Sequence, residues 1–138
     1  MLRPDLKAEI SRIRMRKGTG LLSQMRTIAY YEICITREGL SVIPRVWRRY
    51  KDFIVFRKEL TRQHRNIKFP PLPSKSRKGR SNLPDMEFLE QRKRGLEAFL
   101  QFLVASDILK ANATVLSFFK RDPASCKLRN AHFKIFFY

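Results

Sequence analysis

The hydrophobic period of this chain changes abruptly near Tyr50–Phe53, and that change limits the folds open to it. Before it, apolar and β-branched residues fall in short alternating runs, which are typical of strands. After it, Phe53, Phe56 and Leu60 recur at helical spacing. A chain of 138 residues is enough for one domain. We therefore expect a single α+β domain in which strands come first and helices follow.

The part before the change predicts a three-stranded antiparallel meander. Residues 5–17 alternate loosely and favour a strand, although a short helix is also compatible with them. Residues 27–36 are rich in β-branched and aromatic side chains, and 41–50 follow a turn at 37–39. Pro44 cannot donate to a sheet, so the third strand is expected to be an edge strand or to carry a bulge.

The part after the change predicts a helical subdomain of three to four helices. One helix is expected over 52–64, the longest over 84–105 and a short one over 113–120. Between the first two, Pro70-Pro71-Leu72-Pro73 forces an extended, proline-rich connector of the polyproline type. The meander is expected to pack against these helices.

Positive charge is the strongest global feature of the chain. It carries 30 Lys and Arg against 12 Asp and Glu, a net charge of +18. Residues 45–80 alone hold 13 basic and 2 acidic residues. This balance favours polyanionic partners, either nucleic acid or an anionic membrane surface. No apolar run is long enough to span a bilayer and no signal-peptide pattern is present, so we expect an intracellular, soluble protein.

Nothing in the chain predicts catalysis. Cys34 and Cys126 lie far apart without CxxC spacing, so neither a disulfide framework nor a metal site is indicated. His64 and His132 lack a neighbouring acid or nucleophile, and no phosphate-binding glycine loop is present. We expect no enzymatic role, no cofactor and no metal.

Arg92 interrupts an apolar stripe on the longest predicted helix. The stripe reads Leu89, Arg92, Leu96, Phe99 and Leu103. A guanidinium on a core-facing stripe is costly unless an anion or an acceptor meets it, so Arg92 could line the mouth of a ligand site. Alternatively, it reaches the helix edge or pairs with a carboxylate such as Glu90 or Asp85. Gly95 is costly in a helix interior, which indicates a close approach to the helix backbone there.

Two further basic elements accompany Arg92. Arg48-Arg49-Tyr50-Lys51 combines planar guanidinium forks, suited to phosphate, with an aromatic face for a sugar-like ring. In a strand, Arg49 would share a side with Trp47; alternatively, the motif is a solvated basic turn with Tyr50 in the core. Lys75 follows prolines that fix its position at low entropic cost, although it could also be an ordinary exposed lysine.

These elements, in this order and spacing, resemble the phosphoinositide-binding phox-homology (PX) domain family. The motifs are Arg48-Arg49-Tyr50-Lys51-Asp52-Phe53, then Phe69-Pro70-Pro71-Leu72-Pro73-Ser74-Lys75, then Arg92-Lys93-Arg94-Gly95-Leu96. The resemblance covers residues 5–121 and leaves 122–138 as a C-terminal extension of uncertain structure. It implies a membrane-targeting module that recognises phosphatidylinositol 3-phosphate on endosomal-type membranes, with a broad basic surface for anionic lipid.

The resemblance also implies a role for each of four residues. Arg49 matches the arginine that grips the 3-phosphate, and Tyr50 matches the aromatic residue that packs on the inositol ring. Lys75 matches the lysine near the lipid-linked 1-phosphate. Arg92 matches the arginine that bonds the ring hydroxyls at positions 4 and 5.

The loop after the proline segment departs from the family pattern. In the family, this loop often carries apolar residues that enter the bilayer. Here Leu83 and Pro84 are its only apolar residues, and they follow the cations Arg77, Lys78 and Arg80. Attraction to anionic lipid would then supply more of the membrane affinity and make it salt-sensitive. The resemblance places the protein in the cytoplasm, peripheral on endosomal or vesicular membranes.

Other functions stay open on the sequence alone. The charge would bind nucleic acid nonspecifically, although no helix-turn-helix, zinc-ligand set or RNP-type motif predicts specific binding. The Pro70–Pro73 segment or the C-terminal tail could bind a protein partner, as in an interaction adaptor. The surplus cations Arg45, Arg57 and Lys58 could admit more highly phosphorylated head groups or form a second anion site.

Overall fold

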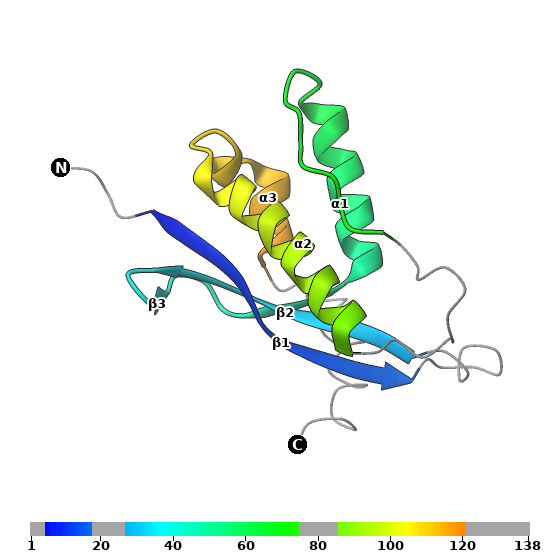
Figure 1. Cartoon of the computed structure of the whole chain (residues 1–138). Coiled ribbons are helices and arrows are strands. Elements are labelled where there is room, and N and C mark those ends of the chain that lie inside the picture. The colour runs from blue at the N-terminus through cyan, green and yellow to red at the C-terminus, as the bar shows by residue number, and fades with distance from the viewer. Residues whose placement is uncertain (1–4, 18–26, 75–85, 121–138) are drawn as a thin grey trace.

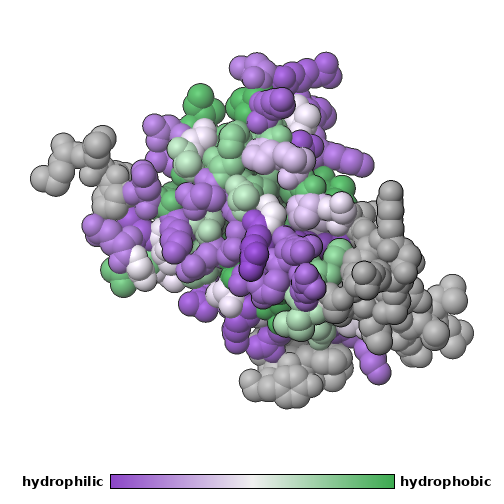
Figure 2. All heavy atoms as spheres, in the orientation of Figure 1, coloured by the Kyte–Doolittle hydropathy of each residue, from purple (hydrophilic) through white to green (hydrophobic). Residues whose placement is uncertain are grey.

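An antiparallel sheet with helices packed on one of its faces forms this molecule (Figure 1). The computed structural model describes residues 5–17, 27–74 and 86–120. Strands come first and helices follow, so the predicted α+β class is confirmed. None of the described helices is long and apolar enough to cross a membrane. In the same orientation, Figure 2 shows many hydrophilic residues across the described surface.

Strand β2 (Thr27–Arg37) is the centre of the sheet. It pairs with β1 (Leu6–Lys17) on one side and with β3 (Leu40–Ser41) and β4 (Val46–Arg49) on the other, always antiparallel. The strands predicted over 5–17 and 27–36 are therefore confirmed. The pairing of β1 with β2 shifts by one residue between Ile10 and Arg12, which is a β-bulge.

The strand predicted over 41–50 is broken in the structure. β3 ends at Ser41 and β4 begins at Val46, and Pro44, which has no N–H to donate, lies in the gap. The predicted turn before it is a two-residue hairpin in which Glu38 (φ 52°) and Gly39 (φ 79°) both take the left-handed conformation.

Three α-helices follow the sheet: α1 (Tyr50–Gln63), α2 (Met86–Ala105) and α3 (Ala113–Phe118), with a 3₁₀ helix at Leu109–Ala111. The prediction that the first helix begins at Asp52 was two residues late. The Asp52 carboxylate accepts a hydrogen bond from the Arg49 backbone N–H at 2.9 Å, so it caps the helix from inside the first turn. Residues 84–85 of the predicted long helix lie outside the described residues.

The core lies between the sheet and the helices. It is formed by side chains that are 0% exposed, among them Tyr31, Ile33, Phe53, Leu60, Leu96, Phe99, Leu100 and Leu103. The rings of Phe56 and Phe118 stack with their centroids 3.9 Å apart, which joins α1 to α3. The Phe56 ring also meets the Phe99 ring of α2 edge to face, with centroids 6.0 Å apart, and the candidate site lies where the start of α1 contacts α2.

Candidate functional site

The guanidinium of Arg92 lies over two aromatic rings. Its Cζ is 4.1 Å from the ring centroid of Tyr50, the first residue of α1, and 4.6 Å from that of Phe88 on its own helix. Cation–π contacts of this kind contribute about 0.5–2 kcal/mol each. Of the two carboxylates considered as alternative partners, Glu90 approaches Lys93 at 3.9 Å. Asp85 lies outside the described residues.

The end of the proline-rich connector is bonded to the same two side chains. The Tyr50 hydroxyl donates to the Pro73 carbonyl, and Arg92 Nη2 donates to the Ser74 carbonyl at 3.1 Å. We call this meeting of Tyr50, Pro73–Ser74 and Arg92 the junction. The structure thus brings together Tyr50, the end of the proline-rich segment and Arg92. Lys75 is the next residue and lies outside the described residues, so its role stays a prediction.

Gly95 allows the connector to approach α2 this closely. A Cβ added at Gly95 would lie 2.9 Å from Pro73 Cγ and 3.0 Å from Pro73 Cδ, which real Cβ atoms almost never show. The sequence predicted a close approach at this glycine, and the approaching group is Pro73.

Arg57 holds the other end of the connector. Its Nε donates to the Pro70 carbonyl at 2.9 Å and its Nη2 to the Phe69 carbonyl at 3.1 Å. The sequence marks Arg57 only as a surplus cation that could bind phosphate and does not predict this structural role. Prolines have a backbone carbonyl but no N–H group, so a proline-rich segment carries acceptors that need donors from elsewhere. An arginine on the preceding helix was the sequence feature that could have indicated this role.

Arg48 and Arg49 serve different purposes although they are neighbours. The Arg48 side chain is 8% exposed, and its Nη2 donates to the Lys120 carbonyl at 2.6 Å. Its Cζ also lies 5.4 Å from the Phe118 ring centroid. Arg48 therefore ties β4 to the end of α3.

The Arg49 side chain points to the opposite side of β4, because successive residues of a strand alternate. It shares that side with Trp47, as the sequence predicted for a strand. Within the described residues, the Arg49 guanidinium makes no recorded hydrogen bond or ion pair. Arg49 is half-exposed and immediately precedes Tyr50. It pairs with Tyr30, which pairs with Arg14, so its side chain lies on the sheet face of these residues, and its role in the site stays a prediction.

Tyr31 adds a group that the sequence analysis did not connect with the site. Burial raises the pKa of the Tyr31 phenol, and the positive charge of Arg92 acts in the opposite direction. Tyr31 is 0% exposed. Its hydroxyl therefore stays protonated at neutral pH, and it is buried without a hydrogen-bond partner among the described residues.

The predicted membrane-contact residues Arg77, Lys78, Arg80 and Leu83 lie outside the described residues. The described part of the site is therefore the junction, in which Arg92 lies over Tyr50 and the connector is anchored through its backbone carbonyls. Arg49 is the residue immediately before Tyr50.

Comparison with known proteins gives a consistent picture. The family model for the PX domain matches residues 42–122. Sorting nexin-3 of Neurospora crassa is 38% identical over 78 residues, covering 56% of this chain and 53% of that protein. Sorting nexin-13 of Mus musculus is 37% identical over 90 residues, 63% of this chain and 9% of that protein. The chain thus spans about half the length of the sorting nexin-3 relative and a small part of sorting nexin-13.

A solved structure extends the match to the fold. The X-ray structure of a designed CISK-PX domain superposes with a TM-score of 0.66 at 28% sequence identity. The match covers 83% of this chain and 99% of the other. It therefore takes in more of the chain than the family model does.

Proposed function

This chain belongs to the PX domain family, and from that premise we propose that it is a phosphoinositide-binding module that brings its protein to membranes. The preferred lipid is phosphatidylinositol 3-phosphate on endosomal-type membranes. The sorting nexin relatives support a role in membrane trafficking. We further propose that residues 5–121 act as the binding domain and that 122–138 are an extension to it.

The observation that carries this proposal is the junction. Arg92 is held over Tyr50, and the connector end is bonded to both. Guanidinium groups and an aromatic face are the groups that recognise a phosphorylated sugar ring. Their arrangement needs no rearrangement of the helices before a ligand arrives, which lowers the entropic cost of binding.

Each residue of the site has a proposed task. Arg49 binds the 3-phosphate, Tyr50 packs on the inositol ring, Lys75 meets the 1-phosphate, and Arg92 bonds the ring hydroxyls at positions 4 and 5. Arg92 covers one face of Tyr50 in the structure. When the inositol ring packs on Tyr50, the guanidinium moves off this face to bond the ring hydroxyls, which the long arginine side chain permits without movement of α2.

Membrane attachment follows from charge in this proposal. Arg77, Lys78 and Arg80 attract anionic lipid, each contributing about 1 kcal/mol near a charged leaflet, while Leu83 contributes little insertion. The affinity therefore falls as salt is added. The role is one of binding, on the cytoplasmic side, with no reaction assigned to it.

Vesicle sedimentation at physiological salt tests the proposal. Wild-type protein should pellet with vesicles that contain phosphatidylinositol 3-phosphate and much less with vesicles of equal charge that lack it. Arg49→Ala should lose this selectivity and keep only weak, salt-labile binding. Arg65→Ala removes the same charge from an exposed position beyond α1 and is the matched control. Equal pelleting of all three proteins would reject the site.

A further inference from the structure

Strand β1 forms an edge of the sheet, and α2 covers only half of that edge. Gln101 Oε1 and Glu97 Oε2 accept hydrogen bonds from the backbone N–H groups of Ala8 and Ile10, both at 2.8 Å. Gln101 Nε2 donates to the Leu6 carbonyl at 3.1 Å. These bonds show that the even-numbered residues of this half direct their backbone groups outward, where α2 satisfies them.

The bulge between Ile10 and Arg12 reverses this alternation. After it, the outward backbone groups belong to Ile13, Met15 and Lys17. Over 5–17, 27–74 and 86–120, no side chain hydrogen-bonds the backbone of these three residues. The second half of β1 is therefore an edge whose described surroundings leave its outward N–H and carbonyl groups available.

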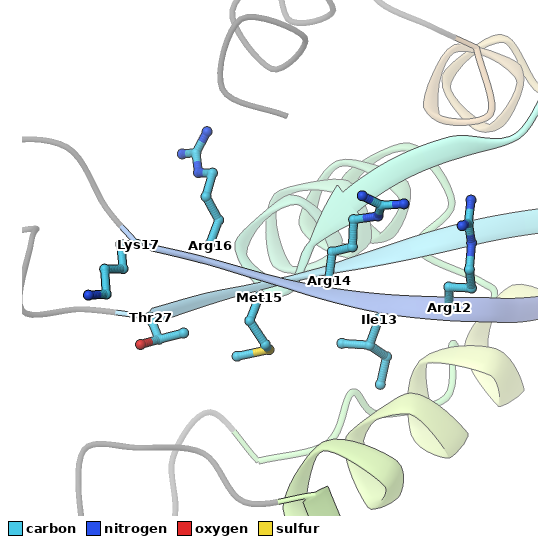
Figure 3. A pocket seen from close by; sticks show the side chains of 7 residues that line it. All are labelled: Arg12, Ile13, Arg14, Met15, Arg16, Lys17 and Thr27. Atoms are coloured by element: carbon cyan, nitrogen blue, oxygen red, sulfur yellow. The ribbon is translucent and has the colours of Figure 1, made fainter. Parts of the chain in front are cut away.

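The side chains of this half differ sharply between its two sides (Figure 3). Arg12, Arg14 and Arg16 point to one side, and Ile13 and Met15 point to the other. An open hollow of about 670 Å³ is lined by Arg12–Lys17 together with Thr27. Side chains from both faces of the strand line this hollow, so it runs along the edge of β1. We call Arg12–Lys17 the edge strip.

Arg16 carries a second and independent sign of a missing partner. It is 9% exposed, and its Nε and Nη1 are buried with no hydrogen-bond partner among the described residues. Its Cζ lies 5.1 Å from the Tyr30 ring centroid, which holds the guanidinium in place. Buried donors without an acceptor are costly, and a carboxylate at this position would satisfy them.

We propose that the edge strip binds an extended acidic segment of a partner protein, which adds to β1 as a further strand. The segment pairs with the outward groups of Ile13, Met15 and Lys17. Its acidic side chains, at alternate positions, face the arginine side of the strip, and its apolar side chains face Ile13 and Met15. Alternate residues of a strand lie about 6.6 Å apart, so the two ladders of side chains match in spacing. This activity is separate from lipid binding.

Charge favours a protein segment of this kind. The six residues of the strip include Arg12, Arg14, Arg16 and Lys17 and no acidic residue. Glu32 bonds Arg12 at 2.8 Å and Arg45 at 3.3 Å. Within the described residues no carboxylate is paired with Arg16, so an incoming carboxylate meets no described like charge at the Arg16 end of the strip.

The test uses the full chain and a fluorescein-labelled octapeptide of alternating Glu and Val. Fluorescence anisotropy measures affinity, and NMR of the backbone amides maps the contact. One control peptide has the same composition with the four Glu placed before the four Val. The second control is the alternating peptide with a methyl group on the nitrogen of every other amide. It is made in two versions, methylated on the odd or on the even amides, because only one set of amides faces the β1 edge and pairs with it. Arg16→Ala is compared with Arg65→Ala.

The proposal expects tighter binding of the alternating peptide than of the block peptide. It also expects amide shifts centred on Ile13 and Met15, and loss of binding in one N-methylated register. Arg16→Ala should weaken binding about tenfold, as for the loss of a charge-assisted hydrogen bond, and Arg65→Ala should not.

Four outcomes would overturn it. Equal affinity for the two peptide orders would mean unspecific charge attraction. Shifts confined to the helices would place the contact elsewhere. Self-association through the strip, seen as concentration-dependent shifts of Ile13 and Met15 without peptide, would make a second copy the occupant. If Arg16→Ala lost vesicle binding and kept peptide binding, the strip would belong to a membrane instead.

Discussion

The junction joins segments that are far apart in the chain, whereas the edge strip is a single run of consecutive residues. At the junction, α1, the connector and α2 are tied by hydrogen bonds to the carbonyls of Pro73 and Ser74. At the edge strip, the backbone geometry comes from one bulge and one strand pairing. The first region therefore depends on tertiary packing for its shape, and the second depends on register.

This difference predicts which changes separate the two regions. A substitution that moves the connector should damage lipid binding and leave peptide binding at the strip unchanged. A substitution in the edge strip, such as Arg16→Ala, should weaken peptide binding and leave lipid binding unchanged.

The largest expected effect is at Gly95. Gly95→Val places a branched side chain where even a Cβ would lie 2.9 Å from Pro73, so the connector must move. Overpacking of this kind costs about 1–3 kcal/mol, and we expect the free energy of unfolding to fall by the upper part of that range. Urea denaturation measures it, with Ala98→Val at an exposed position of the same helix as control. Similar stability for the two variants would mean that the connector does not press on α2.

Substitution of Arg48 should lower stability, whereas substitution of Arg49 should lower lipid binding. Arg48→Met keeps most of the side-chain volume but removes the bond to the Lys120 carbonyl, so we expect a loss of about 2 kcal/mol in unfolding free energy. Arg49→Ala should change stability by less than about 0.5 kcal/mol, as is usual for a surface site with no hydrogen bond to lose among the described residues, while it abolishes selective lipid binding. Urea denaturation and vesicle sedimentation of both variants give the comparison. The opposite assignment of effects would mean that the strand side of each arginine is wrong.

Tyr50→Phe sharpens the account of the junction. It removes the hydroxyl that donates to the Pro73 carbonyl but keeps the aromatic ring below Arg92. We expect a loss of about 1 kcal/mol in unfolding free energy. Vesicle binding should weaken only several-fold, because the ring still meets the inositol. Complete loss of binding would show that the anchored connector, rather than the ring, governs recognition.

The smallest effect concerns Glu32, beside the edge strip. Burial acts to raise the pKa of the Glu32 carboxyl, but hydrogen bonds from Arg12 and Ser11 and the charges of Arg12 and Arg45 outweigh it, so the pKa is lowered. A lowered folded-state pKa gives stability above the unfolded pKa of about 4.3, which is lost as pH falls through the folded value.

The measurement is the pH dependence of unfolding. Glu32→Gln should be less stable than wild type at neutral pH by up to about 1 kcal/mol, since the pair with Arg12 is partly exposed, and the difference should disappear in acid. A difference that persisted below the folded pKa would indicate lost packing instead of lost charge. The same variant releases Arg12 and should bind the Glu–Val peptide slightly better.

The sequence predicted the elements of the junction well because local chemistry determines them. An arginine in an apolar stripe and a glycine in a helix interior are locally unfavourable, and each pointed to a partner outside its own helix. Those partners are Tyr50 and Pro73. The order of the basic and proline motifs then indicated the family.

Other features depended on contacts that local patterns do not contain. The structural role of Arg48 requires α3 to end beneath β4, and that of Arg57 requires the connector to run along α1. The break around Pro44 removed four residues from the predicted strand, and β3 and β4 on either side of it pair, within the described part of the chain, only with β2, as expected of an edge. The edge strip depends on the bulge after Ile10, since a shift of one residue reverses the side of every later side chain.

A structure of the protein with a short-chain phosphatidylinositol 3-phosphate tests the central claim most directly. We predict that the 3-phosphate lies within hydrogen-bond distance of the Arg49 guanidinium, that the inositol ring packs on Tyr50, and that Arg92 bonds the ring hydroxyls. A head group bound away from Tyr50, or held by Arg49 alone while Arg92 keeps its contacts to Tyr50 and Ser74, would contradict the account.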